Sequence, residues 1–104
     1  MDSKILLGKI LQRFSDKKIS QVENYNSFSY IGETGNTVYV TREKGKDTSI
    51  PFQKILIGID AYKENPMLYD EGPNSLRNIG ITHINSPIWS LLHLLSKKDY
   101  ETDY

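Results

Sequence analysis

Two neighbouring stretches decide the fold of this chain: GPNSLRNIGI at residues 72–81 and SPIW at residues 86–89. Proline is tolerated in the first turn of a helix and glycine favours the position just past the last turn, so Pro73 and Gly80 predict a short helix between them. If Gly80 is left-handed, the isoleucine after it packs back on that helix. The Ser-Pro pair of the second stretch predicts another helix, which runs to about Ser96.

The two helices resemble a helix-turn-helix in outline, but the second helix is a poor reader of DNA. The intervening residues 81–85 are longer than the usual turn of three or four residues. Apolar side chains cover about 220° of the second helix, which leaves a narrow stripe of Ser90, His93 and Lys97. Burying each large apolar side chain gains roughly 1.5–3 kcal/mol, so we expect this helix in the core.

Two further helices follow from hydrophobic periodicity. Residues 4–18 place apolar side chains on one arc at the 3.6-residue period, with Asp2 or Ser3 as the cap. Residues 52–64 carry a second such stripe after Pro51, which suits a first helical turn. Gly58 weakens this helix by about 1 kcal/mol relative to alanine, so a neighbouring element should approach closely there.

Between these helices, apolar residues recur every second residue instead of every 3.6 residues. Residues 28–40 alternate in the way a β-hairpin does, and Gly35 and Asn36 tolerate the positive φ that tight turns demand. A second turn at residues 44–47 leads to residues 48–50, which add a possible third short strand. The sequence therefore predicts a sheet of two or three antiparallel strands.

The predicted fold is a small α+β domain with an N-terminal helix, a hairpin sheet and three C-terminal helices. With 104 residues the chain fits one domain. We expect that domain to span residues 1–98, followed by an acidic tail at residues 99–104. The predicted core consists of Leu7, Leu11, Phe14, Phe28, Val38, Val40, Phe52, Ile55, Leu56, Ile59, Leu76, Trp89, Leu92 and Leu95.

Composition excludes several classes of protein. The chain has no cysteine, which removes disulfides and thiolate metal sites and favours a reducing cytoplasm. No apolar run approaches the ~18 residues that a membrane span needs, so no membrane partner is expected. Thirteen basic and thirteen acidic residues balance, which removes the simplest argument for nucleic acid. The oligomeric state stays open.

Nucleic-acid contact is nevertheless the favoured function, because basic residues gather in the second turn. A basic hairpin loop supplies salt-dependent contacts to phosphates that do not depend on base sequence. Such a domain would suit a larger microbial regulator or DNA-processing protein. The candidate contact residues are Arg42, Lys44 and Lys46, with Lys17, Lys18 or Arg77 in support.

The alternative is a protein-interaction module, an adaptor or inhibitor. Tyrosine is enriched at interfaces, and an exposed edge strand can pair with a partner strand. The candidate interface residues are Tyr25, Tyr39 and Tyr100.

Catalysis ranks third, as a metal-dependent hydrolase or nuclease. His83 and His93 stand ten residues apart without thiolates, whereas zinc sites need three or four protein ligands. The carboxylates of Glu64, Asp70 and Glu71 flank the helix-ending pairs Asn65-Pro66 and Gly72-Pro73, where solvent-exposed acidic residues are common. We therefore expect no enzyme activity, no metal and no cofactor.

Overall fold

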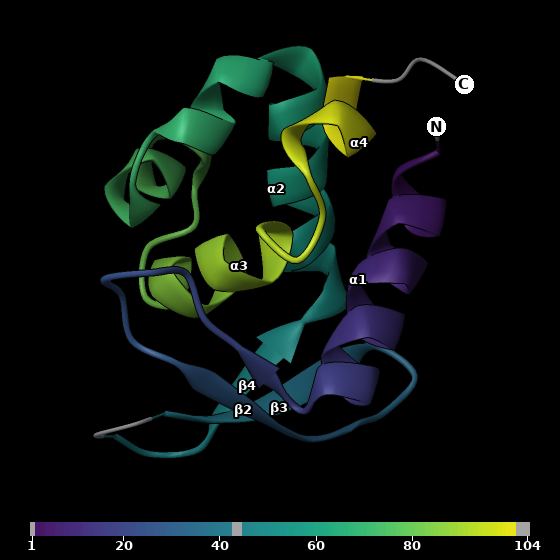
Figure 1. Cartoon of the computed structure of the whole chain (residues 1–104), viewed down its shortest axis with the longest axis vertical. Coiled ribbons are helices and arrows are strands. Elements are labelled where there is room, and N and C mark those ends of the chain that lie inside the picture. Colours follow the sequence, from purple (N-terminus) through teal and green to yellow (C-terminus); the bar gives the residue numbers. More distant parts are fainter. Residues whose placement is uncertain (1, 43–44, 102–104) are drawn as a thin grey trace.

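The protein is built in two layers, an antiparallel sheet and a set of helices stacked on one of its faces (Figure 1). The computed structural model describes residues 2–42 and 45–101. The combination of an antiparallel sheet with separate helices confirms the predicted α+β class. The elements in chain order are α1 (Ser3–Lys17), β1 (Ile19–Ser20), β2 (Phe28–Glu33), β3 (Thr37–Arg42), β4 (Thr48–Pro51), α2 (Phe52–Glu64), η1 (Pro66–Asp70), η2 (Pro73–Ile79), α3 (Asn85–Leu92) and α4 (Lys97–Glu101).

Helix α1 forms where the apolar period predicts it. The Asp2 carboxylate accepts the Lys4 backbone N–H at 2.8 Å, so Asp2 is the cap. At the other end Lys18 is left-handed, with φ 65°, and its N–H donates to the Phe14 carbonyl. The chain then turns directly into the sheet.

The sheet has four strands in the order β1-β2-β3-β4, each antiparallel to the next. The predicted sheet of two or three strands lacked β1, in which Ile19 pairs with Ser29 and Ser20 with Phe28. Two residues are too few to show an alternating pattern, so only the pairing with β2 defines this strand.

The hairpin between β2 and β3 differs from the predicted turn. The Thr34 N–H donates to the Thr37 carbonyl at 2.8 Å, and the Asn36 side chain accepts from both threonine hydroxyls. Positive φ angles among the described residues occur at Lys18, Asn24 and Gly80 alone, so the expectation of positive φ at Gly35 and Asn36 is wrong. A β-bulge between Tyr30 and Gly32 adjusts the register instead.

The predicted helix end at Gly80 is confirmed, and it is a C-cap of the Schellman type. Gly80 has φ 91°, its N–H donates to the Arg77 carbonyl, and the Ile81 N–H donates to the Leu76 carbonyl at 3.1 Å. Ile81 and Leu76 are both buried. The helix it closes, η2, is a 3₁₀-helix.

Helix α3 is the centre of the core, as its apolar surface predicts, but its bounds are shorter. It begins at Asn85 without a side-chain cap, so Ser86 is inside the helix, and it ends at Leu92 rather than near Ser96. Its partner is α2, where a Cβ on Gly58 would stand 2.9 Å from the Leu92 Cδ1 atom. Gly58 thus allows α3 to pack closely against α2, as predicted from the glycine inside this helix.

Most of the predicted core is buried, and three of its members are only half-buried at the margin: Leu11, Phe52 and Leu56. The segment expected as an acidic tail contributes as well, because residues 99–101 belong to α4 and Tyr100 is 2% exposed. Residues 102–104 lie outside the described residues. None of the helices in the described part of the chain has both the length and the apolar character of a membrane span.

Candidate functional site

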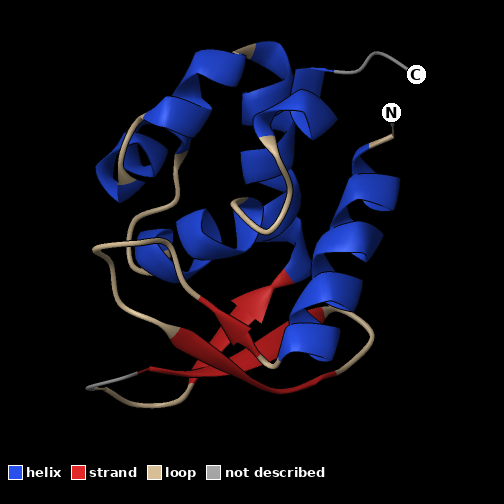
Figure 2. Cartoon of the chain, viewed as in Figure 1, coloured by secondary structure: helices blue, strands red, loops and turns tan. Residues whose placement is uncertain are grey.

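One face of the sheet is not covered by any described helix (Figure 2). Alternation along β3 buries Val38 and Val40 against the helices and turns Tyr39 the other way. The large apolar side chains exposed here are Ile19 (45%), Ile31 (50%) and Tyr39 (37%). We call this surface the outer sheet face; its register partners are the polar residues Ser29, Thr41 and Ser49.

The edges of this sheet are poor templates for an added strand. Strand β1 has two residues, and β4 has four and ends in Pro51, which lacks an N–H. The bulge at Ile31 further distorts the free part of β2. A partner therefore meets the outer sheet face more readily than an edge, which weighs against the edge-strand part of the protein-interaction hypothesis.

The predicted basic loop is the β3–β4 turn. The Arg42 Nε donates to the Thr48 hydroxyl at 3.1 Å, so this guanidinium is held against the sheet. Lys46 is exposed beside Asp47, and Lys44 lies outside the described residues. An open hollow of about 470 Å³ is lined by Arg42, Gly45, Lys46, Asp47, Thr48 and Ser49.

The structure does not bring the six predicted basic residues together. Lys17 and Lys18 lie at the end of α1, where the Lys18 ammonium is 5.1 Å from the centre of the Tyr30 ring. Arg77 lies on η2, in the helical layer (Figure 1). Arg42 and Lys46 thus share one surface at the β3–β4 turn, while Lys17 and Lys18 share another at the end of α1.

The three predicted interface tyrosines have different surroundings. Tyr39 is on the outer sheet face, and Tyr25 is exposed with its ring 4.6 Å from that of Trp89. The surface position expected for Tyr100 is wrong, because α4 turns its ring into the core and its hydroxyl donates to the Leu92 carbonyl. This burial raises the pKa of Tyr100 far above its usual range.

The polar stripe predicted on α3 serves the packing. The Ser90 hydroxyl is buried 2.6 Å from that of Ser20, which ties α3 to β1. The His93 ring lies between those of Tyr69 and Trp89, with centroid distances of 4.1 and 4.3 Å. Both His93 nitrogens contact backbone carbonyls, at 2.8 and 2.9 Å.

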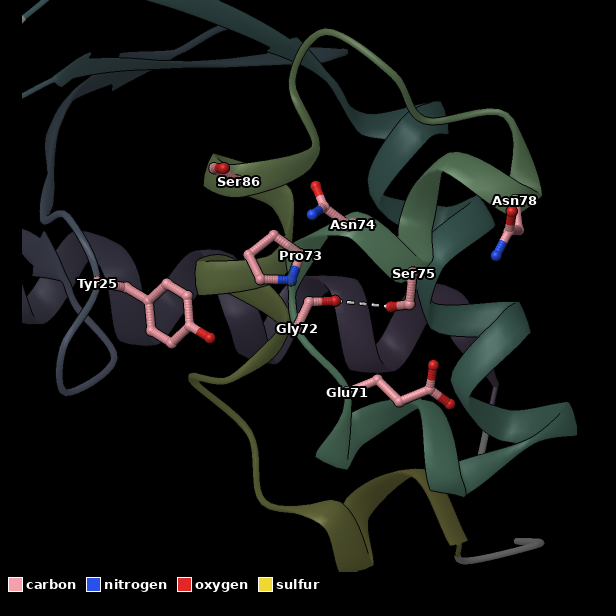
Figure 3. Close-up of a pocket in the computed structure, with 8 residues that line it drawn as sticks. All are labelled: Tyr25, Glu71, Gly72, Pro73, Asn74, Ser75, Asn78 and Ser86. Atoms are coloured by element: carbon pink, nitrogen blue, oxygen red, sulfur yellow. Dashed lines mark hydrogen bonds between the residues drawn. The ribbon is translucent and has the colours of Figure 1, made fainter.

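A polar pocket opens between η2, the start of α3 and the loop before β2 (Figure 3). Its volume is about 600 Å³. We call it the Tyr25 pocket. It is lined by Tyr25, Glu71, Gly72, Pro73, Asn74, Ser75, Asn78 and Ser86. Sequence reasoning missed this site because its residues come from segments up to about 60 positions apart, and no local pattern joins them.

Within residues 2–42 and 45–101, no group of three or more histidines and carboxylates lies close enough to hold a metal ion. Comparison of the chain with protein-family models, curated proteins and solved structures gave no match.

Proposed function

We propose that the chain is a non-catalytic binding module that docks a partner protein on its outer sheet face. The observation that supports this is the grouping of exposed apolar side chains. Six large apolar residues are exposed in the described part of the chain, and three of them, Ile19, Ile31 and Tyr39, lie on this face. Exposed apolar surface that clusters on one side is typical of interaction sites.

The chemistry of the face indicates the kind of partner. Its polar positions are uncharged hydroxyls, those of Ser29, Thr41 and Ser49. An apolar centre among neutral hydroxyls suits a protein that offers an apolar patch of its own. The lack of cysteine supports a partner in the cytoplasm.

The experiment is affinity capture by the full chain from a nuclease-treated lysate, read by mass spectrometry. Tyr39→Asp places a charge at the centre of the face and should abolish capture of the specific partner. Met67→Asp is the matched control, because Met67 is 70% exposed on η1, in the helical layer. A partner lost equally from both variants, or kept by both, contradicts docking on this face.

Nucleic-acid contact is the second candidate, favoured by the hollow at the β3–β4 turn. Arg42 and Lys46 stand there beside the Ser49 hydroxyl, a phosphate-binding group, while the Thr48 hydroxyl is bonded to the Arg42 Nε and the Lys46 carbonyl. Asp47 in the same hollow opposes an anion. This candidate predicts that the chain binds a labelled single-stranded oligonucleotide or duplex, that binding weakens steeply with salt, and that Lys46→Ala weakens it further. No binding at low salt overturns it.

A further inference from the structure

The Tyr25 pocket is separate from the outer sheet face and has the dimensions of a small-molecule site. Its volume of about 600 Å³ falls within the roughly 300–1,000 Å³ typical of ligand pockets. Its walls come from three segments: the loop that carries Tyr25, the stretch from Glu71 to Asn78, and Ser86 at the start of α3 (Figure 3).

Polar groups without protein partners line this pocket. In the described structure, the side chains of Asn74, Asn78 and Ser86 and the hydroxyl of Tyr25 make no hydrogen bond to another protein group, whereas the Ser75 hydroxyl donates to the Gly72 carbonyl. Amides and hydroxyls of this kind donate and accept at once. The pocket therefore matches a ligand with several neutral hydroxyl or amide groups.

The charge of the lining narrows the ligand class. Glu71 is the one carboxylate among the eight lining residues, which include no lysine, arginine or histidine. A phosphate or carboxylate ligand would meet a like charge and no cation to offset it. Anionic ligands are thereby disfavoured, and nucleotides with them.

A small recess adjoins the pocket. It has a volume of about 50 Å³ and shares Tyr25, Pro73 and Ser86 with the larger hollow, while Phe28 and Trp89 form its apolar walls and Asn26 and Ser90 its polar ones. A recess of this size takes a methyl group, whose burial against Phe28 and Trp89 is favourable. The combined shape is a polar hollow with a small, partly apolar extension.

Tyr25 is held as a platform beside both hollows. Its ring packs on that of Trp89, and the Trp89 indole N–H donates to the Glu71 carbonyl at 2.8 Å. A ring fixed in this way offers its π-face to the C–H groups of a saturated ring at little cost in side-chain freedom.

We infer that the Tyr25 pocket binds a neutral saccharide that carries an acetamido group. The sugar ring lies on Tyr25, its hydroxyls bond to Asn74 and Ser86, and the acetamido methyl enters the recess beside Trp89 (Figure 3). This site is independent of the outer sheet face.

The test is a titration of the ¹⁵N-labelled full chain, followed by NMR, with N-acetylglucosamine, glucose and adenosine as separate probes. N-acetylglucosamine should shift the amides of residues 71–78 and 86, and glucose should bind about tenfold more weakly because it lacks the acetamido group. No shift of these amides by N-acetylglucosamine, or tighter binding of adenosine, overturns the inference.

Matched variants tie binding to the pocket. Tyr25→Ala should weaken binding about tenfold or more, while Tyr39→Ala, also an exposed tyrosine, should leave it unchanged. Gly72→Ala is a second probe, because a Cβ there would meet only the Tyr25 hydroxyl at 3.5 Å, so it narrows the pocket without disturbing the fold. Equal affinity in the wild type, Tyr25→Ala and Gly72→Ala overturns the site.

Discussion

Strand β3 and helix α3 are both rich in apolar residues, yet the structure uses them in opposite ways. Helix α3 is buried from Pro87 to Leu92 and meets other elements on every side. Strand β3 buries Val38 and Val40 and leaves Tyr39 on the open side of the sheet. The difference follows from pattern: an element that is apolar all round must be enclosed, whereas an alternating one can serve the core and a partner at once.

The contrast also shows that the clearest sequence pattern need not mark the functional surface. The helix start and stop residues from Gly72 to Trp89 are the clearest pattern in the sequence, and they specify a helix cap and a core helix. The open surfaces come from weaker patterns, the short strands and the loop that holds Tyr25.

The largest expected effect tests this contrast directly. Trp89→Ala should lower the free energy of unfolding by about 3–5 kcal/mol, because it empties a buried site and frees the Glu71 carbonyl. Tyr39→Ala should cost less than about 1 kcal/mol, since its ring already faces solvent. Urea unfolding followed by circular dichroism measures both. Comparable losses would show that β3 is enclosed as α3 is.

High pH provides the next test, through two tyrosines packed around α3. Burial raises the pKa of Tyr62 and of Tyr100 well above the ordinary value of 10.0. Above pH 10 the unfolded chain releases these protons and the folded chain keeps them, so stability falls with rising pH by about 1.4 kcal/mol per unit for each tyrosine. Below pH 10 this contribution is fully present.

The measurement is the urea midpoint from about pH 9 to about pH 11.5, a range that spans the ordinary tyrosine pKa of 10.0. Tyr62→Phe should reduce the slope above pH 10, and Tyr100, Tyr69 and Tyr30, whose pKa values are also raised, should sustain the rest. A slope that does not change in Tyr62→Phe would mean that this hydroxyl ionises in the folded chain as it does in the unfolded one.

The same two tyrosines should respond oppositely to loss of the hydroxyl. The Tyr62 hydroxyl is buried and has no hydrogen-bond partner among the residues that the structure describes, so Tyr62→Phe should stabilise the protein by about 1 kcal/mol. The Tyr100 hydroxyl donates to the Leu92 carbonyl, so Tyr100→Phe should destabilise by about 1–2 kcal/mol. Thermal unfolding at pH 7 compares them. Changes of the same sign would refute the bonding that separates the two sites.

An effect of similar size concerns the link between the two layers. Ser20→Ala and Ser90→Ala should each cost about 1–2 kcal/mol, because each leaves a buried hydroxyl alone. The double variant should cost less than the sum by about 1 kcal/mol, since it removes both polar groups. Additive losses in a double-mutant cycle would contradict the bond.

Sequence predicted the elements whose pattern is local. The helices at residues 3–17 and 52–64, the hairpin and the Gly80 cap all follow from periodicity or from one residue's conformational preference. Strand β1 was missed because Ile19 and Ser20 owe their conformation to pairing with β2. The early end of α3 was missed because no proline or glycine follows Leu92. In the structure the last turn tightens, since the His93 N–H donates to the Ser90 carbonyl and the Leu94 N–H to the Leu91 carbonyl.

The candidate sites were predicted less well, because exposure depends on what packs where. Tyr39 could be placed from alternation alone. Tyr100 could not, since its acidic neighbours suggested a solvated tail while α4 packs its ring beside Tyr62. The basic residues look clustered only along the chain, and the fold carries Arg77 away from the sheet.

The meander order of the sheet has a consequence for how the chain folds. Every strand pairs with its neighbour along the chain, so the sheet closes only short loops and costs little chain entropy to form. The Ser20–Ser90 bond, by contrast, spans 70 residues. We therefore expect β1 to β4 to assemble early and the docking of α3 on the sheet to complete the folding transition.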